Sequence, residues 1–128
     1  MTTQELAIKF VEMCKQFKNF EVMQTLYADH ITSVEALPND GGVSETTGKE
    51  AVIAKSKKWA SENEIHGADC NGPFLAGNRF AVTFDFAITP KATGHKMDLH
   101  EIAVYTVDNG LVVREEFFYG DNPQAFTR

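Results

Sequence analysis

The sequence predicts an α+β fold, with helices in the first half and a strongly bent antiparallel sheet in the second. Apolar residues recur at helical spacing only up to about residue 61, and period-two alternation replaces that spacing afterwards. This order of helices before strands is typical of α+β domains. The chain of 128 residues is long enough for one hydrophobic core, so we expect a single domain over residues 1–128.

Three helices are predicted in the first half. Thr2-x-x-Glu5 is a capping box that opens the first, whose apolar stripe is Leu6, Phe10, Cys14 and Phe17. Asn19 can cap a second, short helix. Residues 31–36 resemble a short strand, and residues 37–48 form an irregular loop rich in glycine and turn residues. Thr47-x-x-Glu50 is a second capping box, for a third helix that ends near Ser61.

The rest of the chain is predicted to be β-structure. Residues 64–75 form a strand with a bulge or bend at Gly72-Pro73, and residues 79–89 alternate as a second strand. Residues 97–119 form a long hairpin closed near Asn109.

Each strand of this hairpin has an apolar face interrupted by one glutamate, Glu101 or Glu115. An unpartnered buried carboxylate costs several kcal/mol, so the two glutamates indicate a cavity that holds something polar. A three-residue loop would pair Ala103 with Glu115 and place Glu101 diagonally opposite. A two-residue Asn-Gly turn would instead turn Glu116 toward the face of Glu101. We favour the three-residue loop because it gives Leu111 and Val113 a common core face with the residues that follow.

Bulk properties exclude several functions. The net charge of −6 argues against nucleic acid or an anionic membrane as a partner, and the lysines of 55–58 are expected on the wet side of a helix. No signal peptide, membrane span, phosphate loop or metal-ligand spacing is visible, so we expect no cofactor and no metal. Cys14 and Cys70 lack disulfide spacing, which favours reduced thiols in a cytoplasmic protein.

Five segments together resemble the SnoaL-like branch of the nuclear transport factor two-like superfamily. They are Leu26-Tyr-Ala-Asp-His30, Ser33-Val-Glu-Ala36, Gly48-Lys-Glu-Ala-Val52, Gly72-Pro-Phe74 and the hairpin segment Val107–Tyr119. The resemblance implies a cone, with the sheet wrapped around a helix to enclose a pocket. It also implies a range of functions, from ketosteroid isomerases and polyketide cyclases to non-catalytic members.

Comparison with the ketosteroid isomerases makes that particular activity unlikely. The position of the general-base aspartate holds Ala36, that of the oxyanion-hole aspartate holds Ala103, and that of the catalytic tyrosine falls near Phe10 or Val11. The same comparison implies that six residues point into the pocket: His66, Leu99, Glu101, Glu115, Phe117 and Tyr119.

The candidate catalytic residues are Glu115, His66 and Glu101. Aromatic neighbours that desolvate Glu115 would raise its pKa and suit it to acid–base catalysis. The alternative is a glutamate locked by hydrogen bonds with no chemical role, and a lone strand histidine such as His66 is more often a wall residue. The substrate-binding candidates are Trp59, Tyr27, Phe84, Phe86, Tyr105, Phe117 and Tyr119.

Two functions follow from these residues. The first is a cofactor-independent isomerase, cyclase, hydratase or hydrolase that uses a pocket glutamate on a small apolar or polyketide-like molecule. The second is a non-catalytic module that binds a hydrophobic ligand or only dimerises. The outward face of the hairpin is too apolar for a fully wet surface, which predicts a homodimer through Ile102, Val104, Val112 and Phe118.

Overall fold

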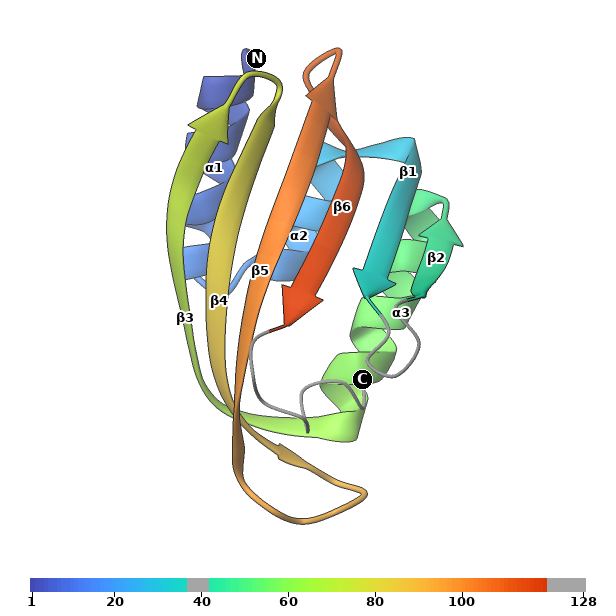
Figure 1. Cartoon of the computed structure of the whole chain (residues 1–128), viewed down its shortest axis with the longest axis vertical. Coiled ribbons are helices and arrows are strands. Elements are labelled where there is room, and N and C mark those ends of the chain that lie inside the picture. Colours follow the sequence, from blue (N-terminus) through green and yellow to red (C-terminus); the bar gives the residue numbers. More distant parts are fainter. Residues whose placement is uncertain (37–41, 120–128) are drawn as a thin grey trace.

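The computed structural model describes residues 1–36 and 42–119. Figure 1 shows the sheet in front of the helices. The helices are α1 (Thr3–Lys15), α2 (Asn19–Leu26) and α3 (Lys49–Glu62). The strands are β1 (Tyr27–Ala36), β2 (Val43–Thr47), β3 (Asn63–Ala76), β4 (Arg79–Pro90), β5 (Met97–Asp108) and β6 (Leu111–Tyr119).

All the strands belong to one curved sheet in the order β2-β1-β6-β5-β4-β3. Neighbouring strands are antiparallel except β1 and β6, which run parallel. The helices cover one face: α1 packs on β3, and α3 packs on β1 (Figure 1). The predicted α+β cone is therefore confirmed, and its inner face lies between the sheet and the helices.

The helix starts follow the sequence prediction only in part. The Thr2–Glu5 capping box forms, with both reciprocal hydrogen bonds present. The predicted box at Thr47 does not form, because Thr47 pairs with Thr32 as the last residue of β2 and α3 begins after Gly48 instead. Asn19 is likewise the first helical residue of α2 rather than its cap.

The segment predicted as an irregular loop contains a strand. Val43–Thr47 pairs antiparallel with β1 and forms one edge of the sheet. Its side chains are mostly exposed, so it has no alternating apolar face by which the sequence would reveal a strand. Residues 37–41 of that predicted loop lie outside the described residues.

The turn of the long hairpin corrects the predicted register. Asp108 pairs with Leu111, so the turn has two residues, Asn109 and Gly110, both with positive φ. Such a turn matches the twist of the flanking strands and favours Asn-Gly. Two residues later the pairing skips Val113, which is a bulge. The bulge restores the parity that the short turn changes, and Glu115 still points inward.

The bulge also changes which residues oppose each other. Glu115 lies opposite Tyr105, not Ala103, and Glu101 lies opposite Tyr119. The two glutamates share the inner face but stand four residues apart along the strand direction, which is roughly 13 Å in a β-strand. The predicted diagonal contact between them is therefore wrong.

Candidate functional site

A cavity of about 220 Å³ lies between the helices and the inner face of the sheet. Its wall is mostly aromatic and aliphatic, with rings from α1, α2, α3, β4, β5 and β6. An apolar cavity of about 150 Å³ is enough to bind benzene, so this one has room for a molecule of one or two rings. The cavity is the space that the curvature of the sheet leaves under the helices.

Among the described residues that line the cavity, Glu101 is the only one with a carboxylate. It is 4% exposed and faces Phe84, its cross-strand partner on β4. Alternation along β5 places it on the inner face with Leu99 and Ala103, as the sequence predicts. A carboxylate in such a wall is positioned to contact a bound molecule directly.

Glu115 lies behind this wall rather than in it. It is 1% exposed, and its two oxygens have different partners. The Tyr27 hydroxyl donates to Oε1 in a short hydrogen bond, and the Ser33 hydroxyl donates to Oε2 over 2.8 Å. Tyr27 also lines the cavity, so it is the residue that connects Glu115 to the cavity.

The polar chain continues from Ser33 to the edge of α3. Lys55 Nζ donates to Ser33 Oγ over 2.9 Å and lies 3.5 Å from a carboxylate oxygen of Glu35. The predicted assignment of Lys55 to the wet side of its helix is wrong, because this side chain reaches inward to β1. We call the residues Tyr27, Glu115, Ser33 and Lys55 the Glu115 chain.

Tyr27 keeps its proton in this arrangement. Burial raises the pKa of Tyr27 well above its ordinary value, and the neighbouring Glu115 charge raises it further. The phenol is therefore neutral at physiological pH and acts as the donor to the carboxylate.

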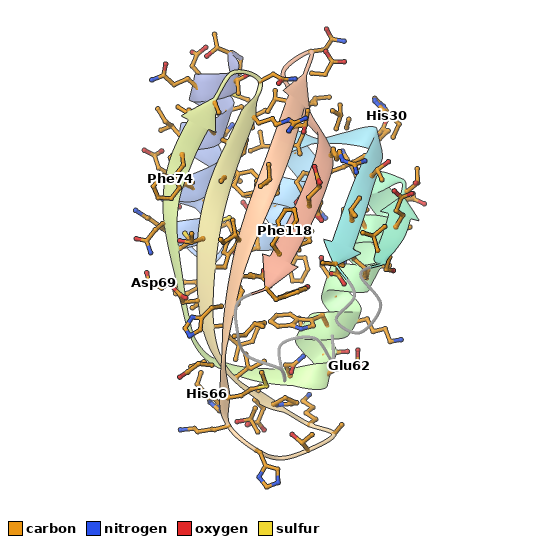
Figure 2. All side chains as sticks on the ribbon, in the orientation of Figure 1. His30, Glu62, His66, Asp69, Phe74 and Phe118 are labelled. Carbon is orange, nitrogen blue, oxygen red and sulfur yellow. The ribbon has the colours of Figure 1, made fainter. Side chains whose placement is uncertain are left out.

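His66 lies outside the cavity, contrary to the expected position beside the glutamates. It is exposed, and its Nε2 is 2.7 Å from Thr89 Oγ1. The β3–β4 pairing skips His66 between Ile65 and Gly67, which marks a bulge. The bulge turns Ile65 and Ala68 into the cavity wall and His66 away from it. Figure 2 shows His66 at the lower, bent end of β3.

Most of the predicted aromatic contacts do lie at the cavity. Trp59 packs on Phe86 with ring centroids 5.5 Å apart, and Phe84 stacks on Phe86 at 5.9 Å. Tyr119 is the exception, because it packs against the core beside the wall without lining it. The predicted set that lines the cavity is Trp59, Tyr27, Phe84, Phe86, Tyr105 and Phe117.

The outer face of the sheet is partly apolar. Ile102 and Phe118 are direct cross-strand partners and are 48% and 46% exposed. Figure 2 shows Phe118 in the middle of the sheet, over β6. Val112, predicted for this face, is fully buried instead, because the two-residue turn pairs it with Val107 on the inner side.

The described part of the chain shows no metal cluster and no membrane-spanning helix. No group of three or more potential ligands there could hold a metal ion. No helix in residues 1–36 and 42–119 is long and apolar enough to cross a membrane. Cys14 and Cys70 are buried free thiols, and burial raises the pKa of both.

Comparison with known proteins settles the family. The model of the SnoaL-like domain matches residues 1–119. The chain belongs to the SnoaL-like family. A candidate SnoaL-like polyketide cyclase from Mesorhizobium loti is 41% identical, with a TM-score of 0.86 over 93% of this chain and all of that one.

More distant solved structures share the fold alone. A candidate isomerase from Bacillus subtilis has a TM-score of 0.74 at 16% identity, over 98% of this chain and 92% of that one. A protein of unknown function with a nuclear transport factor two-like fold, from Mesorhizobium loti, has a TM-score of 0.67 at 18% identity, over 92% and 90% of the two chains. No curated protein matches the sequence. The resemblance read from the sequence is thereby confirmed at the level of family and fold.

Proposed function

We propose that this SnoaL-like protein binds a small, largely apolar molecule in its cavity and moves a proton on it with Glu101. The observation that carries the proposal is a carboxylate, 4% exposed, in the wall of a mostly apolar cavity. Aromatic surface would bind the body of the ligand, and Glu101 would contact its reacting atom. The reaction class is a cofactor-independent isomerisation or cyclisation.

The proton transfer would be internal to the ligand. The Glu101 carboxylate would accept a proton from a C–H bond beside a carbonyl and return it to another atom of the same molecule. The enzyme ends unchanged, and no oxidant or reductant is consumed. The names of the relatives from Mesorhizobium loti and Bacillus subtilis, a candidate cyclase and a candidate isomerase, support this class of chemistry.

In this proposal Glu115 acts through Tyr27 rather than on the ligand, because Tyr27 stands between it and the cavity. His66 has no role in the reaction, since it lies on the far side of a bulge against Thr89. The sequence analysis made Glu115 the first choice for proton transfer. The cavity wall favours Glu101 for that role.

The second candidate is a binding protein without catalysis. It is favoured by the Glu115 chain, in which three hydrogen bonds join neighbouring side chains, as in a structural network. This candidate shares the cavity and the ligand class with the first. The two differ only in whether Glu101 exchanges a proton.

Deuterium exchange separates the two candidates without knowledge of the natural substrate. The probe is 4-hydroxy-1-tetralone, a two-ring compound with acidic hydrogens beside its carbonyl, followed by NMR in D₂O. We expect the protein to accelerate exchange at that carbon, Glu101→Gln to abolish the acceleration, and Glu64→Gln on the exposed part of β3 to retain it. Binding of the probe without accelerated exchange would support the non-catalytic candidate.

We also propose that the protein is a homodimer through the outer face of the sheet. The exposed pair Ile102–Phe118 forms its centre, with Val104 of β5 beside it. A two-fold axis would place this patch against the same patch of a second copy, removing large apolar side chains from water. The cavity lies on the other side of the sheet, under the helices, so such a dimer would not cover it.

A further inference from the structure

The hydrogen bonds of the Glu115 chain have a fixed donor-to-acceptor direction, and Lys55 is the donor that sets it. An ammonium group can only donate, so the Ser33 oxygen must accept the 2.9 Å bond from Lys55 Nζ. Ser33 has one hydroxyl hydrogen, and it is directed at Glu115 Oε2, 2.8 Å away. Oε2 is therefore an acceptor.

The other oxygen of Glu115 is an acceptor as well. The Tyr27 hydroxyl donates to Oε1, and the raised pKa of Tyr27 means that the phenol holds its proton. Two donors converge on one carboxyl group, with a cation one residue further along. This arrangement fits an ionised carboxylate, which only accepts hydrogen bonds.

The consequence for the cavity concerns Tyr27. A phenol has one hydrogen to donate, and here Glu115 takes it. The Tyr27 oxygen can still accept a hydrogen bond from a ligand, and its donation to the carboxylate makes it a stronger acceptor. Glu101, on the same cavity wall, also accepts when it is ionised.

We infer that the cavity selects an apolar molecule that presents a hydroxyl hydrogen to Tyr27, in preference to one that presents only a carbonyl. A carbonyl oxygen placed against the Tyr27 oxygen would meet another acceptor, and both would lose hydrogen bonds to water. Lys55 is a positioning residue in this scheme, because its hydrogen bond to Ser33 Oγ directs the Ser33 hydrogen to Glu115 from outside the cavity. The inference rests on the proposed binding in the cavity and specifies the ligand class.

A matched pair of ligands tests the selection. 1-Tetralol and 1-tetralone have the same two-ring body and differ in a hydroxyl against a carbonyl. Trp59 is the only tryptophan of the chain and lines the cavity, so its fluorescence reports binding of either compound. We expect the alcohol to bind about 10-fold more tightly, as one hydrogen bond of about 1.4 kcal/mol implies.

Variants locate the origin of the preference. Tyr27→Phe should weaken binding of the alcohol about 10-fold and leave the ketone unchanged, so the ratio falls to about one. Lys55→Met should lower the ratio because Ser33 then no longer has to donate to Glu115, so the direction of the Tyr27 hydrogen bond is no longer fixed, and Lys55→Arg should restore it. Lys58→Met, on an exposed part of α3, should keep the native ratio. A loss of packing alone would weaken both ligands together and would not change their ratio.

The outcomes distinguish a failure of the proposed hydroxyl selection from a failure of the cavity as a ligand site. Equal binding of the two compounds to the native chain, or tighter binding of the ketone, would overturn the selection and leave the cavity as a ligand site. A native chain whose Trp59 fluorescence responds to neither compound would overturn the cavity as a ligand site, and the selection with it. An unchanged ratio of the two affinities in Tyr27→Phe would show that another group binds the ligand hydroxyl, and would overturn the role of Tyr27.

Discussion

Ser33 of β1 lies opposite Glu115 of β6 in the parallel strand pair, and its hydroxyl donates to the buried carboxylate over 2.8 Å. Ser33 is fully buried, and it also accepts the hydrogen bond of Lys55. One small side chain thereby joins a helix, an N-terminal strand and the C-terminal strand.

Ser33→Ala should therefore destabilise the protein more than the loss of a single oxygen atom suggests. It leaves one Glu115 oxygen and the Lys55 ammonium without this partner, and an unsatisfied buried polar group costs about 1–3 kcal/mol. The free energy of unfolding, measured by urea denaturation, should fall by that amount. Ser44→Ala on the exposed edge strand β2 is the control and should stay within about 0.5 kcal/mol. Equal effects of both changes would contradict the role of Ser33.

Lys55→Met should cost about 1–3 kcal/mol of unfolding free energy. The change removes the cation that lies 3.5 Å from Glu35 and donates to the buried Ser33 hydroxyl, while retaining the length of the side chain. The Lys55 side chain is 30% exposed, so water screens part of this loss. Lys58→Met, on the exposed side of α3, should have almost no effect in the same urea titration. A Lys55 variant as stable as the native chain would show that its charge is not needed there.

The pairing of β3 with β4 has a second register shift, between Asn71 and Phe74, and Gly72 lies in it. Gly72→Ala should destabilise the protein by more than about 2 kcal/mol. Gly72 has a φ of 135°, and an added Cβ would lie 2.9 Å from the carbonyl oxygen of Ala81. Gly67, on the same strand, has an ordinary backbone and open space around it. Thermal denaturation should therefore separate Gly72→Ala from a near-neutral Gly67→Ala. Two variants with the same melting temperature would refute the close approach at Gly72.

Alkaline pH should weaken the fold through Cys14. Burial, and then the neighbouring Cys70, raises the pKa of Cys14 to about 12 from an ordinary 9.0. The unfolded chain loses this proton first, so the free energy of unfolding falls as pH rises from about 9 to 12, by up to about 1.4 kcal/mol per pH unit. Below pH 9 both states hold the proton, and the contribution is constant.

Urea titrations at pH 8 and pH 10.5 measure this loss. Cys14→Ala should show a smaller difference in unfolding free energy between the two pH values than the native chain does. The buried Tyr27 phenol shifts in the same direction and would account for part of what remains. The same decline in both proteins would assign the loss to groups other than Cys14.

Phe118→Lys should convert the proposed dimer into a monomer. The change places a charge beside Ile102 at the centre of the outer face. Light scattering after size exclusion should give twice the chain mass for the native protein and a single chain mass for the variant. Ile8→Lys, at a similarly exposed position on α1, should remain dimeric. A native protein that is monomeric at micromolar concentration would end the dimer proposal.

The sequence was sufficient for the fold and for the aromatic wall because both depend on local patterns. Alternation along β4 and β5 assigns an inner face to Phe84 and Glu101 regardless of how the strands pair. The family resemblance added the curvature that makes a cavity under that face. These two sources together predicted six aromatic residues of the cavity wall. They missed Phe10, Phe17 and Phe20, whose helical spacing indicated only a core-facing stripe or nothing at all, and they misplaced Tyr119.

The Glu115 chain was not predictable in the same way. Ser33 and Glu115 are 82 positions apart, and they meet only because β1 pairs in parallel with β6. Lys55 resembled one of several solvated lysines, since its reach to Ser33 depends on how α3 packs across β1. Long-range pairings of this kind leave no periodic signal in the sequence.

Two bulges explain the remaining errors. One at His66 reverses the parity of β3 and turns a predicted catalytic residue outward. The other at Val113 offsets the two-residue turn, so Glu115 faced the predicted side for a reason different from the predicted one. A single inserted residue changes the face of everything beyond it, and alternation alone does not reveal it.

The most direct test of the account is a crystal structure of the protein with 1-tetralol bound. We predict electron density for the two rings between Trp59 and Phe84, with the ligand hydroxyl within hydrogen-bond distance of the Tyr27 oxygen. Density only on the outer face of the sheet, or an empty cavity at saturating ligand, would contradict the claim that this cavity is the functional site.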